Sequence, residues 1–131
     1  MEQPPTFDYT VSTSKDFPSA VAAVQEAIAA AGMRVLHIHD VQATLAEKGF
    51  QRDPFQIIEF CNAKYASAFL DADVRIGLCI PCKINVYVHD GKTWISGMRP
   101  IILPMFFPDA DLGSKPEEVD TIIRSIIDRA K

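Results

Sequence analysis

The dipeptide Asp90-Gly91 stands between two segments of alternating apolar and polar residues, and it constrains the fold more than any other feature of the sequence. Asp-Gly favours the tight turn of a two-residue β-hairpin. The predicted cross-strand pairs are His89 with Lys92, Tyr87 with Trp94, and Asn85 with Ser96. One face of this hairpin is apolar and is predicted to face a core; it comprises Ile84, Val86, Val88, Thr93 and Ile95.

Helical and strand periodicities divide the rest of the chain into further elements. Strands are predicted at 7–11, 33–39 and 55–61, and helices at 17–31, 40–48, 63–72 and 114–130. Asp40 and Asn62 are suited to cap the helices that they precede. Ser114 and Glu117 have the spacing of a capping box at the start of the last helix.

The resulting order, β-α-β-α-β-α-β-β-α, predicts an α+β fold. We expect one mixed, mostly antiparallel sheet of about five strands, with helices mainly on one face. The length of 131 residues suits a single domain, 1–131. Within it, 101–113 is a proline-rich apolar connection and 114–131 contains an amphipathic helix.

Charge and hydropathy exclude several classes of protein. The net charge of -4 argues against nucleic acid as a partner. Apolar runs are too short for a membrane span. Residues 1–5 have neither the basic nor the apolar region of a secretory signal. We therefore expect a cytoplasmic protein.

One face of the predicted sheet carries an unusual mixture of side chains. If Leu36, Ile38, Ile58 and Phe60 face the helices, the opposite face collects the following side chains: Val35, His37, His39, Ile57, Glu59, Cys61, Lys83, Asn85, Tyr87, His89, Trp94, Ser96 and Met98. This mixture is too polar for a core and too aromatic for an ordinary solvated surface. It favours a homodimer interface through Tyr87, Trp94 and Met98. A pocket with convergent polar groups is the alternative.

The three cysteines are candidate ligand-binding residues. Cys61 ends a strand just before a helix, where the helix N-terminus favours a thiolate. Cys79 and Cys82 form a C-x-x-C motif, whose spacing permits a local disulfide or a chelating pair for a soft metal. The alternative for each cysteine is a small buried apolar residue.

Other residues extend the candidate site. His37 and His39 share one side of a strand and are candidate metal ligands together with Cys61 and Cys82. Glu59 lies on the same side as Cys61. The sequence has no H-E-x-x-H, G-x-S-x-G, P-loop or G-x-G-x-x-G motif, and we predict no catalytic residue.

Several short motifs resemble those of the domain of unknown function 302 family. They are Glu59-x-Cys61-Asn62, Ala66, Leu70, Pro81-Cys82-Lys83-Ile84, Val86-Tyr87 and Gly91, with Gly32 and Asp40 earlier in the chain. The resemblance covers about 7–100. It implies a small α+β domain that tends to dimerise and has no established activity, and it selects Cys61 and Cys82 as the pair of interest. Relatives often have proline where this chain has Ala63.

Three functions follow from these features. The first is a non-enzymatic binding domain whose Cys61 and Cys82, with Cys79 and Glu59, hold a soft ligand: a thiophilic metal such as Cu(I) or zinc, a haem, or a sulfur adduct. The second is a homodimeric interaction module without chemistry. The third is a thiol redox or sulfur-transfer protein.

Overall fold

Five strands form one sheet in the order β1-β5-β4-β3-β2. The strands are β1 (Asp8–Thr13), β2 (Arg34–Asp40), β3 (Phe55–Cys61), β4 (Cys82–His89) and β5 (Lys92–Met98). The structure is a computed structural model that describes residues 6–131, so the expectation about a leader at residues 1–5 lies outside the described residues. Every neighbouring pair of strands is antiparallel. The α+β class and the five-stranded sheet are therefore confirmed, and the sheet is antiparallel throughout.

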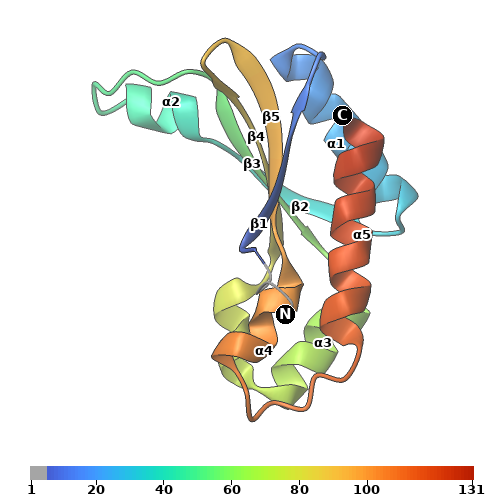
Figure 1. Cartoon of the computed structure of the whole chain (residues 1–131). Helices are drawn as coiled ribbons and strands as arrows, with labels where there is room; N and C mark the ends of the chain where they lie inside the picture. Colours follow the sequence, from blue (N-terminus) through green and yellow to red (C-terminus); the bar gives the residue numbers. More distant parts are fainter. Residues whose placement is uncertain (1–5) are drawn as a thin grey trace.

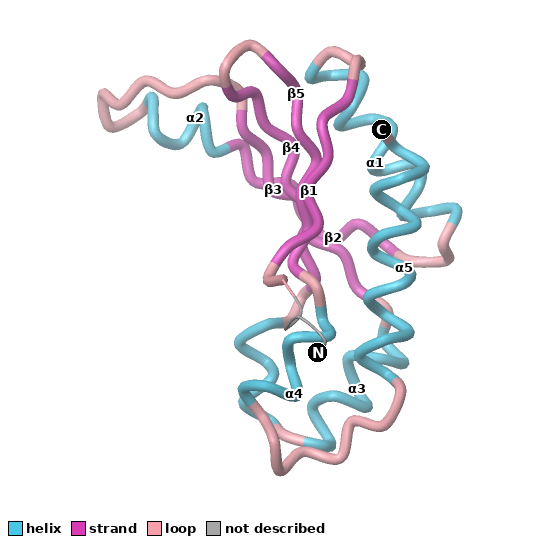
Figure 2. Tube along the Cα trace, in the orientation of Figure 1, coloured by secondary structure: helices cyan, strands magenta, loops and turns pink. Residues whose placement is uncertain are grey.

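Helices lie between the strands and after them. They are α1 (Phe17–Ala30), α2 (Val41–Ala46), α3 (Ala63–Ala72), α4 (Leu103–Phe106) and α5 (Lys115–Ala130), with two short 3-10 helices, η1 (Val74–Cys79) and η2 (Pro100–Ile102). α1 and α5 lie along one face of the sheet, whereas α2 projects away at one end and α3 and α4 gather at the other (Figure 1). Figure 2 shows the same separation of strands and helices.

The β4–β5 hairpin has the register that its turn predicts. Tyr87 is opposite Trp94, and Asp90 and Gly91 both have positive φ, as the tight turn requires. Of the predicted core side chains of the hairpin, Ile84, Val86, Thr93 and Ile95 are buried, whereas Val88, near the turn, is only half-buried. The largest fully buried side chains include Ile28, Ile58, Phe60, Ile84, Val86, Ile95, Ile123 and Ile127.

β2 differs from the predicted alternation. Leu36 was expected to face the helices, but its side chain is 51% exposed, and Val35 packs against the core instead. The register with β3 shifts between Val35 and His37. A bulge of this kind reverses the alternation for part of a strand, and no sequence pattern announces it. Ile38, His37 and His39 keep their predicted faces.

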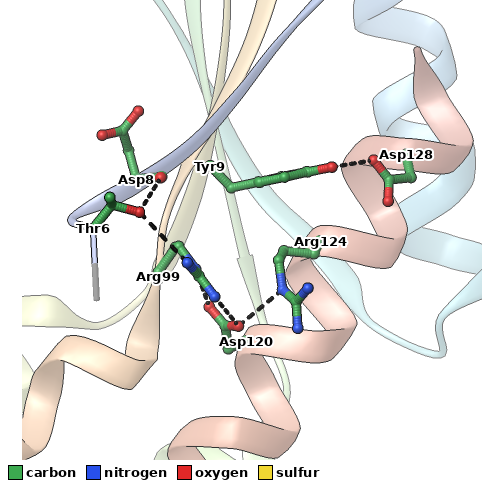
Figure 3. Close-up of polar contacts among 7 residues, drawn as sticks. All are labelled: Thr6, Asp8, Tyr9, Arg99, Asp120, Arg124 and Asp128. Atoms are coloured by element: carbon green, nitrogen blue, oxygen red, sulfur yellow. Dashed lines mark hydrogen bonds and ion pairs between the residues drawn. The ribbon is translucent and has the colours of Figure 1, made fainter. Parts of the chain in front are cut away.

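A polar network ties α5 to the lower ends of β1 and β5 (Figure 3). Asp120 is buried and accepts hydrogen bonds from Arg99 at 3.0 Å and from Arg124 at 2.9 Å. Tyr9 donates a hydrogen bond to Asp128 at 2.6 Å, and this bond raises the pKa of the Tyr9 hydroxyl. The buried carboxylate is thus paired, which offsets the cost of removing it from water.

The last part of the chain departs from prediction in two details. The proline-rich connection contains η2 and α4 rather than irregular chain alone. Ser114 precedes α5 but its side chain makes no capping bond to the helix backbone. It has helical backbone angles and donates instead to Glu118 at 3.5 Å. Among residues 6–131, no helix is both long and apolar enough to cross a bilayer.

Candidate functional site

Cys61 lies where β3 passes into α3. Asn62 caps that helix, accepting a hydrogen bond from the Lys64 N–H at 3.0 Å, as predicted. Strand parity places Cys61 on the open face of the sheet with Glu59. The structure places Cys61, the last residue of β3 and the partner of Arg34 on β2, in the wall of a cavity that it shares with Phe69 and Val119.

Cys79 and Cys82 lie on either side of the bend between η1 and β4. Cys79 is the last residue of η1 and Cys82 is the first of β4, so the C-x-x-C motif precedes a strand, as the sequence predicts. The peptide bond between Ile80 and Pro81 is cis. Cys82 is opposite Phe60 on β3, and its side chain therefore faces the core. All three cysteines are free thiols and partly buried.

Two adjoining cavities at this end of the sheet bring the cysteines together. The smaller has a volume of about 20 Å³ and is lined by Cys61, Cys82 and mostly apolar side chains. The larger has a volume of about 140 Å³ and is lined by Cys79, Cys82 and mostly apolar side chains. Cys82 is common to both walls. The fold thus gathers thiols from β3, η1 and β4 around one residue.

Burial raises the pKa of the Cys82 thiol to about 11, and the neighbouring Cys61 and Cys79 add to the increase. The apolar surroundings disfavour a charged sulfur, and a second negative charge from either neighbour would repel it. Cys82 is therefore a neutral thiol at neutral pH. It becomes a thiolate there only when a cation takes the place of its proton.

The histidines lie away from the thiols. His37 and His39 are on the open face, with ring centroids 4.4 Å apart. His39 Nε2 is 3.0 Å from Glu59 Oε1, and neither side chain lines the two cysteine cavities. His39, Glu59 and Lys83 line a separate open depression beneath α2. The structure thus divides the predicted site into a thiol group and an imidazole–carboxylate group.

The three predicted interface residues also separate. Tyr87 stacks on Phe55 across the strands, with ring centroids 5.2 Å apart. Trp94 is on the same open face and donates from its indole N–H to the His89 carbonyl at 3.2 Å. Met98, at the end of β5, lines the larger cysteine cavity. Only Tyr87 and Trp94 are thus neighbours on the open face.

Comparison with known proteins finds relatives that match nearly the whole chain. The family described as domain of unknown function DUF302 matches residues 9–130. The chain belongs to the DUF302 family. A crystal structure of an uncharacterized conserved DUF302 protein from Bacillus stearothermophilus is similar, with a TM-score of 0.89 and 28% sequence identity; the match covers 97% of this chain and 100% of that one. A search of the curated proteins finds no match.

Few side chains in this DUF302 domain are arranged so that they could bind one metal ion together. Among residues 6–131 no group of three or more His, Cys, Asp or Glu side chains is arranged to hold a metal ion. A structural zinc site uses four ligands, which this arrangement does not supply. A pair of thiols suits an ion that accepts two soft ligands.

Sequence reasoning missed the residues that form the cavity walls. Ile76, from η1, is fully buried, and Leu103, from α4, is nearly so. Both line the larger cavity. They lie in segments without a clear strand or long-helix periodicity. The sequence therefore does not predict that both line one cavity. Lys83, the charged residue of the lining, follows Cys82 directly in a motif of the family resemblance.

Proposed function

We propose that this DUF302 domain is a non-enzymatic binding protein that holds one soft metal ion, of the Cu(I) type, between Cys61 and Cys82. One observation carries the proposal: thiols from separate strands line the same cavity of about 20 Å³. A space of roughly 10–15 Å³ holds a water molecule, so this cavity suits a guest of atomic size. A haem is far too large for it.

The chemistry of the donors supports a soft monovalent ion. Thiolates select Cu(I), which is satisfied by two sulfur ligands, whereas zinc requires more. The apolar walls exclude water, so hard ions that keep water ligands are disfavoured. A reducing cytoplasm, which keeps thiols unpaired, is the compartment that suits such a site.

The raised pKa of the Cys82 thiol favours ion binding over thiol catalysis in this proposal. A reactive cysteine needs a large thiolate fraction near neutral pH, and the raised pKa of Cys82 opposes this. Among the residues that the structure describes, 6–131, no histidine or acidic residue lines either cysteine cavity to act as a base. Ion binding must instead displace the Cys82 proton, so affinity should rise by about tenfold per pH unit for each proton displaced.

Anaerobic transfer of Cu(I) from a chromogenic chelator tests the proposal. We expect the wild-type chain to take one Cu(I), and Cys61→Ser and Cys82→Ser each to abolish this uptake. Cys79→Ser is the matched control and should retain it. Circular dichroism verifies that each variant is folded. Uptake that survives in either Cys61→Ser or Cys82→Ser would refute the site, and loss only in Cys79→Ser would assign it to another cysteine.

Self-association through the open face is a second candidate function. The observation that favours it is the side of the sheet opposite α1 and α5 (Figure 1). The Phe55–Tyr87 stack and Trp94 lie half-buried on that side. Aromatic side chains of this kind are enriched at protein interfaces. The occupant we propose is a second copy of the chain, paired by a twofold axis.

Sedimentation across a range of concentrations tests this candidate. A dimer is expected for the wild-type chain, and Trp94→Ala should shift it toward monomer. Phe106→Ala is the control, because Phe106 is 67% exposed at the opposite end of the molecule. A wild-type chain that remains monomeric at high concentration would contradict self-association.

A further inference from the structure

The larger cysteine cavity is an apolar space of molecular size. Its volume is about 140 Å³, and it lies between the sheet, η1, α4 and α5. Its hydrocarbon walls come from the following residues: Phe69, Ile76, Pro81, Leu103, Val119 and Ile123. An engineered apolar cavity of about 150 Å³ in another protein binds benzene. A guest of about six carbon atoms therefore has the size that this cavity accommodates.

In the described chain, 6–131, the walls of this cavity present no charged group to a guest. Lys83 is the charged residue of the lining, but it is opposite Glu59 on β3 and next to the core-facing Cys82. Successive side chains of a strand point to opposite faces, so the Lys83 ammonium belongs to the open face. Among residues 6–131, no buried side-chain nitrogen or oxygen lacks a hydrogen-bond partner. A polar guest would therefore leave its hydrogen bonds with water and find no unpaired side-chain group in exchange.

Three sulfur atoms distinguish this cavity from an ordinary hydrocarbon interior. Cys79, Cys82 and Met98 bring them to the lining from η1, β4 and β5. Sulfur is polarisable and makes favourable contacts with aromatic rings. Phe69, in the same wall, can pack edge to face with a second ring. These groups favour an aromatic guest over an aliphatic guest of the same size.

One exposed side chain lies at the opening of this cavity. Leu78 lines the cavity and is 88% exposed, so it is in contact with both the interior and the solvent. It belongs to η1, a 3-10 helix of six residues. Exposed side chains change rotamer within nanoseconds. Movement of Leu78 therefore gives a small guest a path that leaves the core undisturbed.

We propose that this cavity binds an uncharged aromatic molecule of one six-membered ring. The volume sets the size of the guest, the apolar walls select against charge and polarity, and the sulfur atoms favour aromaticity. The proposal goes beyond ion binding, because Cys61 does not line this cavity. Cys61→Ser should therefore bind the aromatic guest normally while losing Cu(I), so the two proposals fail separately.

Benzene and pyridine are the matched probes, because they share a ring size and differ in one nitrogen that must leave water. Methyl signals of Ile76 and Ile123, which line the cavity, report occupancy, and buried Ile28, outside the lining, is the reference. We expect benzene to shift the two lining signals and leave Ile28 unchanged. Pyridine at neutral pH should bind about tenfold more weakly. Benzene that leaves both lining signals unchanged, or pyridine that binds as tightly as benzene, would overturn the proposal.

A conservative variant tests the sulfur contacts. Met98→Leu keeps the volume of the side chain and removes its sulfur, so it should weaken benzene binding by about threefold. Met105→Leu is the control, since Met105 is exposed on α4 and does not line the cavity. Equal benzene affinity in the two variants would show that sulfur does not select an aromatic guest.

A filling variant tests the location of the guest. Cys79→Phe places a ring in the cavity and should abolish the benzene shifts. Val74→Phe is its control, because Val74 is 76% exposed on the same helix and does not line the cavity. Circular dichroism verifies that both variants are folded. Benzene that binds a folded Cys79→Phe as tightly as the wild type would place it outside this cavity and refute the site.

Discussion

At the scale of the residue, Cys82 is where the fold and the proposed chemistry meet. It is the first residue of β4, it faces the core opposite Phe60, and it lies in the walls of both cavities. Burial raises the pKa of its thiol, and so do Cys61 and Cys79. The same closeness that disfavours two thiolates would favour a cation placed between them.

The raised pKa of Cys82 predicts how stability depends on pH. The unfolded chain releases this proton near the ordinary pKa of 9.0, whereas the folded chain holds it to about 11. The proton therefore stabilises the fold fully below pH 9, and this contribution falls as pH rises toward 11. The loss approaches about 1.4 kcal/mol per pH unit in that window.

Urea unfolding of the wild-type chain and Cys82→Ala, with reductant, measures this effect. The free energy of unfolding should fall more steeply with pH in the wild type than in the variant. Tyr9 and Tyr87, whose pKa values are also raised, contribute equally to both chains. Parallel pH profiles for the two chains would show that Cys82 is not the titrating group.

At the scale of the element, the contact between β5 and α5 depends on Gly97. A Cβ atom at this position would lie 3.1 Å from both Ile123 Cγ2 and Ile127 Cδ1. Such contacts are too close to be tolerated without movement of the helix or its side chains. Gly97 thus sets how closely α5 approaches the sheet, and a strand pattern alone does not distinguish this glycine from a flexible one.

Gly97→Val should therefore lower the free energy of unfolding by about 1–3 kcal/mol, because it overpacks the interface. The cost should be smaller in an Ile127→Ala background, which removes one of the two side chains in contact. Urea unfolding of the four chains of this double-mutant cycle gives the coupling. Equal costs in the two backgrounds would show that Ile127 does not limit the approach.

The elements differ in how well their sequences predict them. The hairpin pairs and the bounds of 55–61 and 63–72 were predicted correctly, because Asp90-Gly91 and Asn62 act locally. Leu36 was misplaced because a bulge depends on the neighbouring strand. Ser114 was wrongly predicted to cap the last helix. Its backbone has helical angles, and its hydroxyl donates a hydrogen bond to Glu118 rather than to the Glu117 of the predicted capping box.

At the scale of the whole molecule, the two ends of the sheet have different characters. The cysteine cavities lie at one end with α3 and α4, whereas α2 projects from the other (Figure 1). α2 has six residues and none of them is buried. A helix this short has little stability of its own, so its persistence in solution depends on what covers it.

Amide hydrogen exchange at two protein concentrations tests whether a second copy covers α2. A monomer should exchange the α2 amides rapidly and protect those of α5, whose apolar face is buried in the core. Self-association over the open face should slow α2 exchange as concentration rises. Slow exchange that is independent of concentration would contradict both descriptions.

The candidate site could be predicted only in part, because its members come from separate segments. The family resemblance selected Cys61 and Cys82, and the structure places them on one cavity. His37, His39 and Glu59 were grouped with the thiols from strand parity alone. Parity assigns a face but not a position along it, and these three side chains lie on the open face rather than around the thiols.

X-ray absorption at the copper edge, on the chain loaded with one Cu(I), tests the central claim most directly. It identifies the atoms bound to the ion. The account predicts two sulfur neighbours in the wild-type chain and no bound copper in Cys61→Ser. Nitrogen or oxygen neighbours in the wild type would place the ion at the imidazole–carboxylate group on the open face, and would contradict a site between Cys61 and Cys82.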